Sequence, residues 1–398
     1  MKALLIAHGC QVSNEGQQRA QQLGALPGVD LHVVAPDRWH EYGTWRRCTL
    51  PENPTYTFHH EKVRWPWSGP GQWYLHHYPG LTRLIRTLKP DIINLWEEAW
   101  GLVSVQACYL RNRILPEARI VSETEANINR AHPFPFSAFR RYTLRNTDYA
   151  VARQTEGVGV LRAKGYRGPI EVIGNAVDAD LFRPLDREAC KRRLGLSGFV
   201  AGYIGRFIEA KGLIDFIEAL PMCAPETNAL FVGAGPFEDQ IKRRIGELGL
   251  AARVRFLPPS RMADLPEIMN AMDTLLLVSR TTATWKEQFG RVIIEAHACC
   301  TPVIGSSSGA IPEIVGEGGL IVPEGNPHAL AEALEKLRTH AEMRYAIGRL
   351  GRVQVERNFT WRAVAEHMRD IYLKVLSGEN VGAGEIHHGI PTLQDPVR

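Results

Sequence analysis

The sequence has no long hydrophobic run and few cysteines, and each shortage excludes a class of protein. No run approaches the roughly 18 apolar residues of a membrane span, and the apolar start at Met1–Ala7 is too short for a secretion signal. The 7 cysteines include no CxxC pair, and their odd number favours reduced thiols over a disulfide framework. We therefore expect a cytoplasmic protein.

Net charge is also small, at +4 over 398 residues, but it is unevenly divided. Residues 1–195 hold 26 Lys and Arg against 19 Asp and Glu (+7), and residues 196–398 hold 21 against 24 (−3). The cations are scattered rather than massed with stacking aromatics, so a nucleic-acid partner is not expected. The basic front half leaves open a peripheral contact at the inner membrane face, or a phosphorylated acceptor.

Short apolar runs alternate with helix-length amphipathic stretches along the chain, a pattern typical of parallel sheets covered by helices. Turn formers at Gly174–Pro184 interrupt this alternation and indicate a boundary. The pattern predicts an α/β fold of two Rossmann-like, doubly wound domains, residues 1–177 and 178–358. We expect a helix over residues 360–377 to join the first domain, and a flexible tail over 378–398.

An unusual segment, Thr44–Gly80, has several tryptophans on a stretch punctuated by Pro and Gly. One interpretation is a long irregular loop whose aromatic rings pack onto the first domain. The other is a wall of an acceptor site.

Ligands of open parallel sheets bind beyond the carboxyl ends of the strands, so the residues after each expected strand are candidate site residues. Gly205, Arg206 and Lys211 follow the expected strand Val200–Ile204. These residues would suit a diphosphate next to a helix N-terminus. The glycine lets the backbone approach the ligand closely, the arginine offers a bidentate guanidinium, and the lysine adds a point charge. Solvated surface charge is the alternative.

Two further strands lead into similar turns. Gly233-Ala234-Gly235-Pro236 follows Ala229–Val232, with Pro236 expected at the first position of a helix. After Thr274–Val278, Glu287 precedes an expected helix that contains Glu295. Glu295 lies in an apolar run, where a carboxylate is costly unless it binds something. Surface charge at both glutamates is the alternative.

Together these residues resemble the retaining glycosyltransferases of family 4, also called glycosyl transferases group 1, which have the GT-B architecture of two Rossmann-like domains facing across a cleft. The resemblance covers roughly residues 170–325. It rests on motifs in the family's order: Gly174-Asn175-Ala176-Val177-Asp178, Gly205-Arg206 with Lys211-Gly212, Gly233-Ala234-Gly235-Pro236, Glu287 with Glu295 around Gln288-Phe289-Gly290, and Ser308-Gly309-Ala310-Ile311-Pro312-Glu313.

The resemblance implies a nucleotide-sugar donor, such as a UDP-, GDP- or ADP-sugar, held by the second domain. Arg206 and Lys211 would stabilise the departing diphosphate, Glu287 would contact the sugar, and Glu295 would bind the ribose. Catalytic roles are implied for Glu287, Arg206 and Lys211. The implied donor-binding set is Gly205, Arg206, Lys211, Gly233, Gly235, Pro236, Glu287, Gln288, Phe289, Gly290 and Glu295.

The same resemblance implies neither a cofactor nor a metal, because the two cations supply the charge neutralisation that a metal would otherwise provide. Asp178-Ala179-Asp180 spells the DxD pattern with which glycosyltransferases of another fold hold a cation. It lies in the domain-linking motif, so we expect it to serve the linker structure.

The first domain departs from the family pattern, so the acceptor is not implied by the resemblance. A Gly-Gly turn after the first strand is replaced by His8-Gly9-Cys10, and a histidine expected after a middle strand is absent. The candidate acceptor-side residues are Glu97, Glu98, Glu123, Glu125 and Asn127. A glycan, a lipid-linked sugar or a small molecule could be the acceptor.

The resemblance thus implies a retaining, metal-independent transfer of a hexose-type sugar to an acceptor hydroxyl. Two alternatives are a sugar-nucleotide epimerase or hydrolase of the same fold, and a non-catalytic nucleotide-sugar binding protein. A nicotinamide oxidoreductase is disfavoured, because no GxGxxG follows the first strand.

Overall fold

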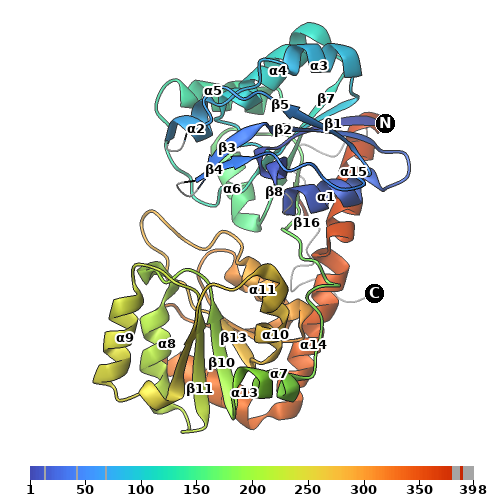
Figure 1. The fold of residues 1–398 in the computed structure, drawn as a ribbon. Coiled ribbons are helices and arrows are strands. Elements are labelled where there is room, and N and C mark those ends of the chain that lie inside the picture. Colours follow the sequence, from blue (N-terminus) through green and yellow to red (C-terminus); the bar gives the residue numbers. More distant parts are fainter. Residues whose placement is uncertain (13–14, 42–43, 68–69, 379–385, 389–398) are drawn as a thin grey trace. The chain divides into compact units, whose positions relative to one another are not determined.

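The computed structural model describes all residues except 13–14, 42–43, 68–69, 379–385 and 389–398. The chain forms two compact units (Figure 1). The N-terminal unit comprises Met1–Gly174 together with helix α15 (Trp361–Ser377) and strand β16 (Ile386–His388). The C-terminal unit comprises Asn175–Thr360.

The N-terminal unit is built on a parallel sheet whose strands are ordered β16-β9-β8-β7-β6-β1-β2-β5. Its other strands are β1 (Lys2–Ile6), β2 (Asp30–Pro36), β5 (Thr57–Glu61), β6 (Ile92–Leu95), β7 (Arg119–Thr124), β8 (Tyr149–Ala152) and β9 (Ile170–Val172), and a separate hairpin pairs β3 (Arg38–Glu41) with β4 (Thr44–Arg47). Its helices before α15 are η1 (His8–Gln11), α1 (Glu15–Gly24), α2 (Pro70–Leu75), α3 (Leu81–Leu88), α4 (Leu102–Ile114), α5 (Phe136–Arg145) and α6 (Thr155–Ala163).

Helices cover both faces of this sheet. In Figure 1, α3, α4 and α5 lie above the strands, and α1 packs against α15 below them. Leu4, Ile93 and Ile120, on neighbouring strands, are fully buried, which is what continuous apolar runs in a parallel sheet predict.

The C-terminal unit is also built on a parallel sheet, whose strands are ordered β12-β11-β10-β13-β14-β15. Its strands are β10 (Phe199–Ile204), β11 (Thr227–Val232), β12 (Val254–Leu257), β13 (Thr274–Leu277), β14 (Val303–Ser306) and β15 (Gly319–Val322). Its helices are α7 (Arg187–Leu194), η2 (Glu209–Lys211), α8 (Leu213–Ala219), η3 (Leu220–Met222), α9 (Glu238–Glu247), η4 (Ala251–Arg253), η5 (Met262–Asp264), α10 (Leu265–Asn270), α11 (Arg291–Ala298), α12 (Ile311–Val315), η6 (Gly316–Gly318), α13 (Pro327–Thr339) and α14 (Ala341–Asn358).

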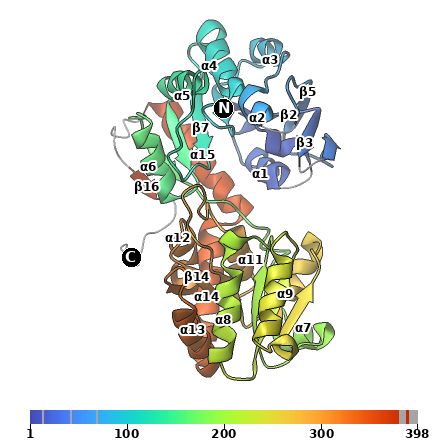
Figure 2. The same ribbon diagram turned by 90° about the vertical axis from the view of Figure 1, so that its left-hand side faces the viewer.

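The helices of this unit also form two layers. Helix α8 packs against α9 and α13, and α11 packs against α10 and α14. Figures 1 and 2 show these groups on either side of the strands. Two doubly wound sheets are therefore confirmed as the fold class.

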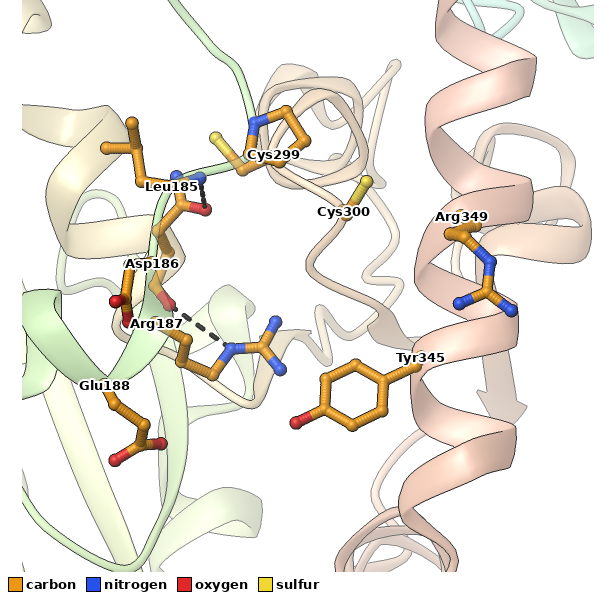
Figure 3. Close-up of a pocket in the computed structure, with 10 residues that line it drawn as sticks. Leu185, Asp186, Arg187, Glu188, Cys299, Cys300, Tyr345 and Arg349 are labelled. Carbon is orange, nitrogen blue, oxygen red and sulfur yellow. Dashed lines mark hydrogen bonds between the residues drawn. The ribbon is translucent and has the colours of Figure 1, made fainter.

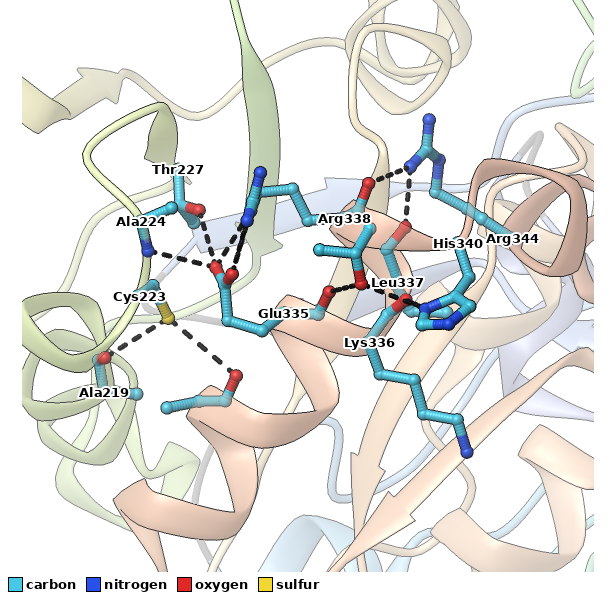
Figure 4. A network of polar contacts seen from close by, with 12 residues as sticks. Ala219, Cys223, Ala224, Thr227, Glu335, Lys336, Leu337, Arg338, His340 and Arg344 are labelled. Carbon is cyan, nitrogen blue, oxygen red and sulfur yellow. Dashed lines mark hydrogen bonds and ion pairs between the residues drawn. The ribbon is translucent and has the colours of Figure 1, made fainter.

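A polar network fastens helix α13 to the start of β11 (Figure 4). The Glu335 carboxylate accepts hydrogen bonds from the Ala224 amide at 3.1 Å and from Arg338 at 2.7 to 3.0 Å. The hydrogen bond from Arg338 lowers the pKa of Glu335. Because the pair is about 29% exposed, its net contribution to stability is small.

The aromatic segment Thr44–Gly80 is not the irregular loop we expected, since it contains β4, β5 and α2. Its tryptophans, Trp45, Trp65, Trp67 and Trp73, are 45 to 55% exposed. About half of the surface of each ring is therefore covered, and both the packing interpretation and the acceptor-wall interpretation remain predictions. Residues 68–69 of the segment lie outside the described residues.

The expected flexible tail also contains one described element, the short strand β16, which pairs with β9. The other tail residues beyond Gly378 lie outside the described part of the chain. Among the residues that are described, no helix combines the length and apolar composition needed to cross a membrane.

Glu123 is the centre of a buried ion cluster in the N-terminal unit, and our interpretation of it as an acceptor-side residue is corrected. Its side chain is 1% exposed and pairs with Arg19 at 2.7 Å and with Arg153. Asn94 donates to the same carboxylate at 2.9 Å and accepts from Tyr372 of α15 at 2.6 Å. Glu123 therefore ties α15 to the sheet and is not accessible to a ligand.

This cluster predicts a large loss of stability in Glu123→Ala. Removing one partner leaves two buried guanidinium groups uncompensated, which costs about 3–5 kcal/mol in the free energy of unfolding. Burial alone would raise the pKa of Glu123, but Arg19 and Arg153 lower it to about 2. A lowered native pKa stabilises the fold above the ordinary value of 4.5, and this contribution disappears as the pH falls toward 2.

Urea unfolding between pH 3 and pH 7 measures both effects. The control is Glu117→Ala, whose side chain is exposed. Equal stability of the two variants at pH 7 would show that the cluster does not hold the unit together.

Candidate active site

The predicted donor residues lie at the carboxyl edge of the C-terminal sheet. Strands β11, β10, β13 and β14 are neighbours in that order, so the loops that follow them are adjacent. Gly205, Arg206 and Lys211 follow β10; Gly233, Gly235 and Pro236 follow β11; Glu287 and Gln288 follow β13. The sheet thus brings together residues from three separate predicted motifs.

Glycines allow the first two loops to pack directly on each other. A Cβ on Gly233, whose φ is 140°, would lie 2.0 Å from the carbonyl oxygen of Gly205. A Cβ on Gly235 would lie 2.3 Å from the carbonyl oxygen of Phe207, whose amide donates to Ala234 at 2.9 Å. These glycines therefore fix the loop after β11 against the loop after β10, and contact with a donor stays a prediction. Pro236 lies in a turn two residues before α9 rather than at its first position.

Lys211 and Glu287 form the central ion pair of the edge. The Lys211 Nζ lies 2.5 Å from Glu287 Oε2, and the side chains are 17% and 10% exposed. Ser279 Oγ donates to the same oxygen at 3.0 Å, and the Lys211 ammonium lies 5.0 Å from the centroid of the Trp285 ring. The pair links the loop after β10 to the loop after β13, and it leaves a partly exposed cation at the edge.

Gly212 makes the approach of these two loops possible. Its φ is 67°, in the left-handed region, and a Cβ there would lie 2.0 Å from the carbonyl oxygen of Val278. The Arg280 amide donates to Ala210 across the same junction at 2.7 Å. Arg280 also pairs with Asp215 of α8. The backbone that presents Lys211 is thus held on both sides.

The loop after β14 supports Glu287 from the other side. Gly309 has a φ of 54°, and a Cβ there would lie 2.1 Å from the Glu287 carbonyl oxygen. Ala310 donates its amide to that oxygen at 3.2 Å, and Ser306 Oγ donates to the Ser279 carbonyl at 2.6 Å. The Ser308–Glu313 loop, one of the motifs on which the resemblance rests, therefore positions Glu287.

Arg206 is a second cation at this edge. The Tyr203 hydroxyl donates to its carbonyl oxygen at 2.8 Å, which orients the backbone, while the side chain is exposed. Within the described part of the chain, no carboxylate pairs with the Arg206 guanidinium. An anion bound here would meet a guanidinium that has no competing counterion.

Glu295 lies on helix α11, which starts after Gly290 (φ 78°). It is half-buried, and burial raises its pKa, an effect that Arg291 partly offsets. No described side chain or amide donates a hydrogen bond to its carboxylate. A half-buried carboxylate without donors is costly unless a ligand supplies them.

Gln288 is exposed, whereas Phe289 is 3% exposed and its ring packs against Phe359 at 5.9 Å. Phe289 is therefore a core residue, and only its backbone is a candidate for donor contact. A Cβ on Gly290 would lie 2.7 Å from the Leu277 side chain, so Gly290 sets the close packing of α11 on β13.

In the N-terminal unit, the carboxyl edge holds Glu97 between two histidines. Glu97 Oε2 lies 2.8 Å from His8 Nδ1 and 3.6 Å from His76 Nε2, and Glu97 Oε1 accepts from the His8 amide at 2.6 Å. Burial would raise the pKa of Glu97, but the two imidazoles hold it well below its ordinary range. Neither histidine is among the site residues predicted from the sequence, although His8 lies two residues after the end of β1.

Aromatic rings surround this cluster. The His8 imidazole stacks on Trp39 with centroids 5.1 Å apart and meets Trp73 edge-on at 5.2 Å. Trp39 is 2% exposed, whereas Trp73 is 45% exposed. An exposed ring beside a histidine–carboxylate pair resembles the wall predicted for the aromatic segment more than a packed loop.

Glu98 and Glu125 lie beside this cluster. Glu98 accepts hydrogen bonds from Thr124 Oγ1 and from the Glu125 amide, both at 2.9 Å. Burial raises the pKa of Glu98 to about 7. Glu125 is exposed, while Asn127 is 5% exposed. Of the predicted acceptor residues, Glu125 is thus the most accessible.

The DxD pattern serves the linker, because Asp178 Oδ1 accepts the amides of Asp180 and Leu181, both at 3.0 Å. Among the described residues, no cluster of three or more His, Cys, Asp or Glu side chains could hold a metal ion.

The C-terminal unit also contains a pocket of about 360 Å³ that is separate from these residues (Figure 3). Its lining includes Arg187, Asn270, Cys300 and Tyr345. Asn270 and Cys300 precede β13 and β14, so this pocket lies at the amino edge of the sheet, opposite the loops described above.

Comparison with known proteins matches residues 164–354 to the family described as glycosyl transferases group 1. The D-inositol 3-phosphate glycosyltransferase of Corynebacterium glutamicum is 34% identical over 236 residues, which is 55% of this chain and 55% of that protein. The enzyme of the same name from Corynebacterium jeikeium is 29% identical over 70% of this chain and 67% of that protein. The first of these alignments spans about half the length of the curated relative.

Solved structures with the same fold include sucrose-phosphate synthase from Thermosynechococcus elongatus, with a TM-score of 0.71, 19% identity, and coverage of 95% of this chain and 100% of that one. HepE of Anabaena in complex with UDP has a TM-score of 0.71 and 21% identity, with coverage of 94% and 100%. These likenesses establish the GT-B fold.

The contact between Gly309 and Glu287 yields a prediction about stability. Gly309→Ala adds both left-handed strain and a clash with the Glu287 carbonyl, whereas Gly249→Ala adds strain alone, since no atom lies within 4 Å of that Cβ. We expect Gly249→Ala to cost about 1–2 kcal/mol and Gly309→Ala at least about 1 kcal/mol more. Urea midpoints of both variants measure the difference, and equal midpoints would mean that the loop after β14 does not support Glu287.

Proposed function

Residues 164–354 match the glycosyl transferases group 1 family, and from that match we propose that the chain is a retaining glycosyltransferase using a nucleotide-activated hexose. The observation that supports this best is that two cations, Arg206 and Lys211, lie in one loop at the sheet edge, while helix α11, which carries the donor-free carboxylate of Glu295, begins at the same edge. The two cations would neutralise a diphosphate, and the hydroxyl groups of a ribose would supply the hydrogen-bond donors that the Glu295 carboxylate lacks.

Arg206 and Lys211 would bind the donor diphosphate. The Arg206 guanidinium offers a bidentate fork to phosphate oxygens, and the Lys211 ammonium adds a point charge. Negative charge grows on the leaving diphosphate as the glycosidic bond breaks, so these cations stabilise the transition state more than the ground state. This supply of charge supports a reaction that needs no metal ion and no cofactor.

The two glutamates would act on different parts of the donor. Glu295 would accept hydrogen bonds from the ribose hydroxyls. Glu287 would accept them from the transferred sugar, while Lys211 and Ser279 hold its other oxygen. The backbone of Phe289–Gly290 would contribute amide donors near the same place.

In our proposal the anomeric configuration is retained because the acceptor oxygen attacks the anomeric carbon from the same face from which the diphosphate leaves. The bond between the anomeric carbon and the phosphate oxygen breaks, and the acceptor oxygen forms its bond to that carbon on the same side. The acceptor proton passes to the departing phosphate oxygen, so no separate protein base is required.

The acceptor would bind at the carboxyl edge of the N-terminal sheet. Glu97 with His8, together with Glu98 and Glu125, offers hydrogen-bond partners for hydroxyl groups, and Trp73 offers an exposed ring for a sugar face. A polyol, glycan or lipid-linked sugar fits this chemistry. The unbridged cysteines support our placing of the enzyme in a reducing compartment, the cytoplasm.

Turnover with a panel of UDP-, GDP- and ADP-sugars, followed by analysis of the product anomer, tests the proposal. We expect one donor to give a glycoside with the anomeric configuration of the donor. Free sugar or an altered sugar nucleotide, formed without any acceptor, would identify a hydrolase or epimerase instead. Tight binding of a donor without turnover on any acceptor would identify a binding protein.

Two substitutions distinguish the proposed roles of Lys211 and Glu295 by their effects on kcat and on the donor KM. Lys211→Ala removes charge that acts on the leaving group, so we expect kcat to fall about 10²- to 10³-fold. Glu295→Ala removes hydrogen bonds made equally in ground and transition states, so we expect the donor KM to rise about tenfold with little change in kcat. Lys242→Ala, which breaks an exposed pair with Glu238, is the control. Full activity in Lys211→Ala would refute its role.

A further inference from the structure

A strongly basic pocket lies in the N-terminal unit, and none of its lining residues belongs to the proposed function. Its volume is about 390 Å³, and its lining includes the four cations Arg141, Arg145, Lys164 and Arg167. The remaining lining residues are Leu144, Thr147, Gly165, Tyr166 and Gly168, so no acidic side chain lines the pocket.

The position of this pocket follows from the topology. Arg145 ends α5 and Thr147 precedes β8, while Lys164–Gly168 connect α6 to β9. The pocket therefore lies at the amino edge of the sheet. His8, Glu97 and Glu125 lie at the carboxyl edge, so the pocket is not part of the proposed acceptor site.

The cations of the pocket have no carboxylate partner among the described residues. Lys164 Nζ donates to the Arg130 carbonyl at 2.5 Å, and Arg167 donates to the Arg162 carbonyl at 3.2 Å. The nearby Asp148 carboxylate is instead shared by Arg111 and Arg119. Carbonyl oxygens satisfy donors but do not neutralise these charges.

The C-terminal ends of α5 and α6 do not neutralise the positive charge of the pocket either. A helix C-terminus carries roughly −0.5 elementary charge, so the two ends together offset about one of the four cations. Burial and the nearby Arg140 guanidinium lower the pKa of Lys164. A bound anion would act in the opposite direction and favour the charged ammonium.

The pocket of Figure 3 provides a contrast within the same molecule. It is of similar size, about 360 Å³, and it also lies at an amino edge, but Asp186 and Glu188 balance Arg187 and Arg349 in its lining. An excess of cations is therefore not a general property of pockets between helix ends in this fold.

We propose that the pocket formed by Arg141, Arg145, Lys164 and Arg167 binds a phosphate group, either of a soluble phosphate ester or of a phospholipid headgroup. Guanidinium forks suit the tetrahedral oxygens of phosphate. Two of the arginines, Arg141 and Arg145, lie four residues apart on α5 and thus on one helix face. The pocket size admits one phosphate with part of the group that bears it.

The double variant Arg141→Gln/Arg145→Gln tests this proposal. Both side chains are exposed and have no recorded partner in the described structure, and glutamine preserves helix propensity, so the variant is expected to fold. The matched control is Lys62→Gln/Arg86→Gln, which removes two exposed cations from the same unit. The proposed donor site is intact in all three proteins, so its own affinity for phosphate cancels in the comparison.

The first measurement is the thermal shift with inorganic phosphate against chloride at equal ionic strength. The second is flotation with phosphatidylglycerol vesicles against phosphatidylcholine vesicles. A phosphate shift at least halved only in the pocket variant supports the proposal with a soluble ester as ligand. Loss of vesicle binding only in the pocket variant supports it with a headgroup as ligand. Equal behaviour of the pocket variant and the control in both assays overturns it.

Discussion

The ion pair between Lys211 and Glu287 is the interaction on which the C-terminal edge depends. It joins loops that follow two neighbouring strands, and the glycines at 212 and 309 let the backbone approach closely enough for the pair to form. A buried charge without its partner would cost several kcal/mol, so the pair strongly constrains both loops. The proposed chemistry uses this constraint, because the same ammonium that holds Glu287 faces the growing charge of a leaving group.

The two units use charged side chains differently. In the N-terminal unit, the buried Glu123 is enclosed by Arg19 and Arg153 and serves the fold. In the C-terminal unit, the exposed Arg206 guanidinium has no carboxylate partner, and the half-buried Glu295 carboxylate has no hydrogen-bond donor, among the described residues. Satisfied charges stabilise a structure, whereas unsatisfied ones are available to a ligand. This difference separates Glu123 from Arg206 and Glu295, whereas Lys211 and Glu287 are candidate site residues that are paired with each other.

The sequence predicted β10, β11 and β13 of the C-terminal sheet to within two residues at each end, because each is a continuous apolar run. It failed in the aromatic segment, where β5 lacks such a run. Glu123 was assigned wrongly because β7 extends to Thr124, so that Glu123 lies inside the sheet. The contact of His8 with Glu97 was not predictable, since it depends on β1 and β6 being neighbours across 89 residues of sequence.

The central claim is that the edge formed by Arg206, Lys211 and Glu295 holds a nucleoside diphosphate without help from a metal ion. Titration calorimetry of UDP, GDP and ADP, carried out in excess chelator, tests it most directly. We expect one of the three nucleotides to bind with a stoichiometry of one, and we expect Arg206→Ala and Glu295→Ala each to weaken that binding. Absence of binding by all three, or binding that appears only when a divalent cation is added, would contradict it.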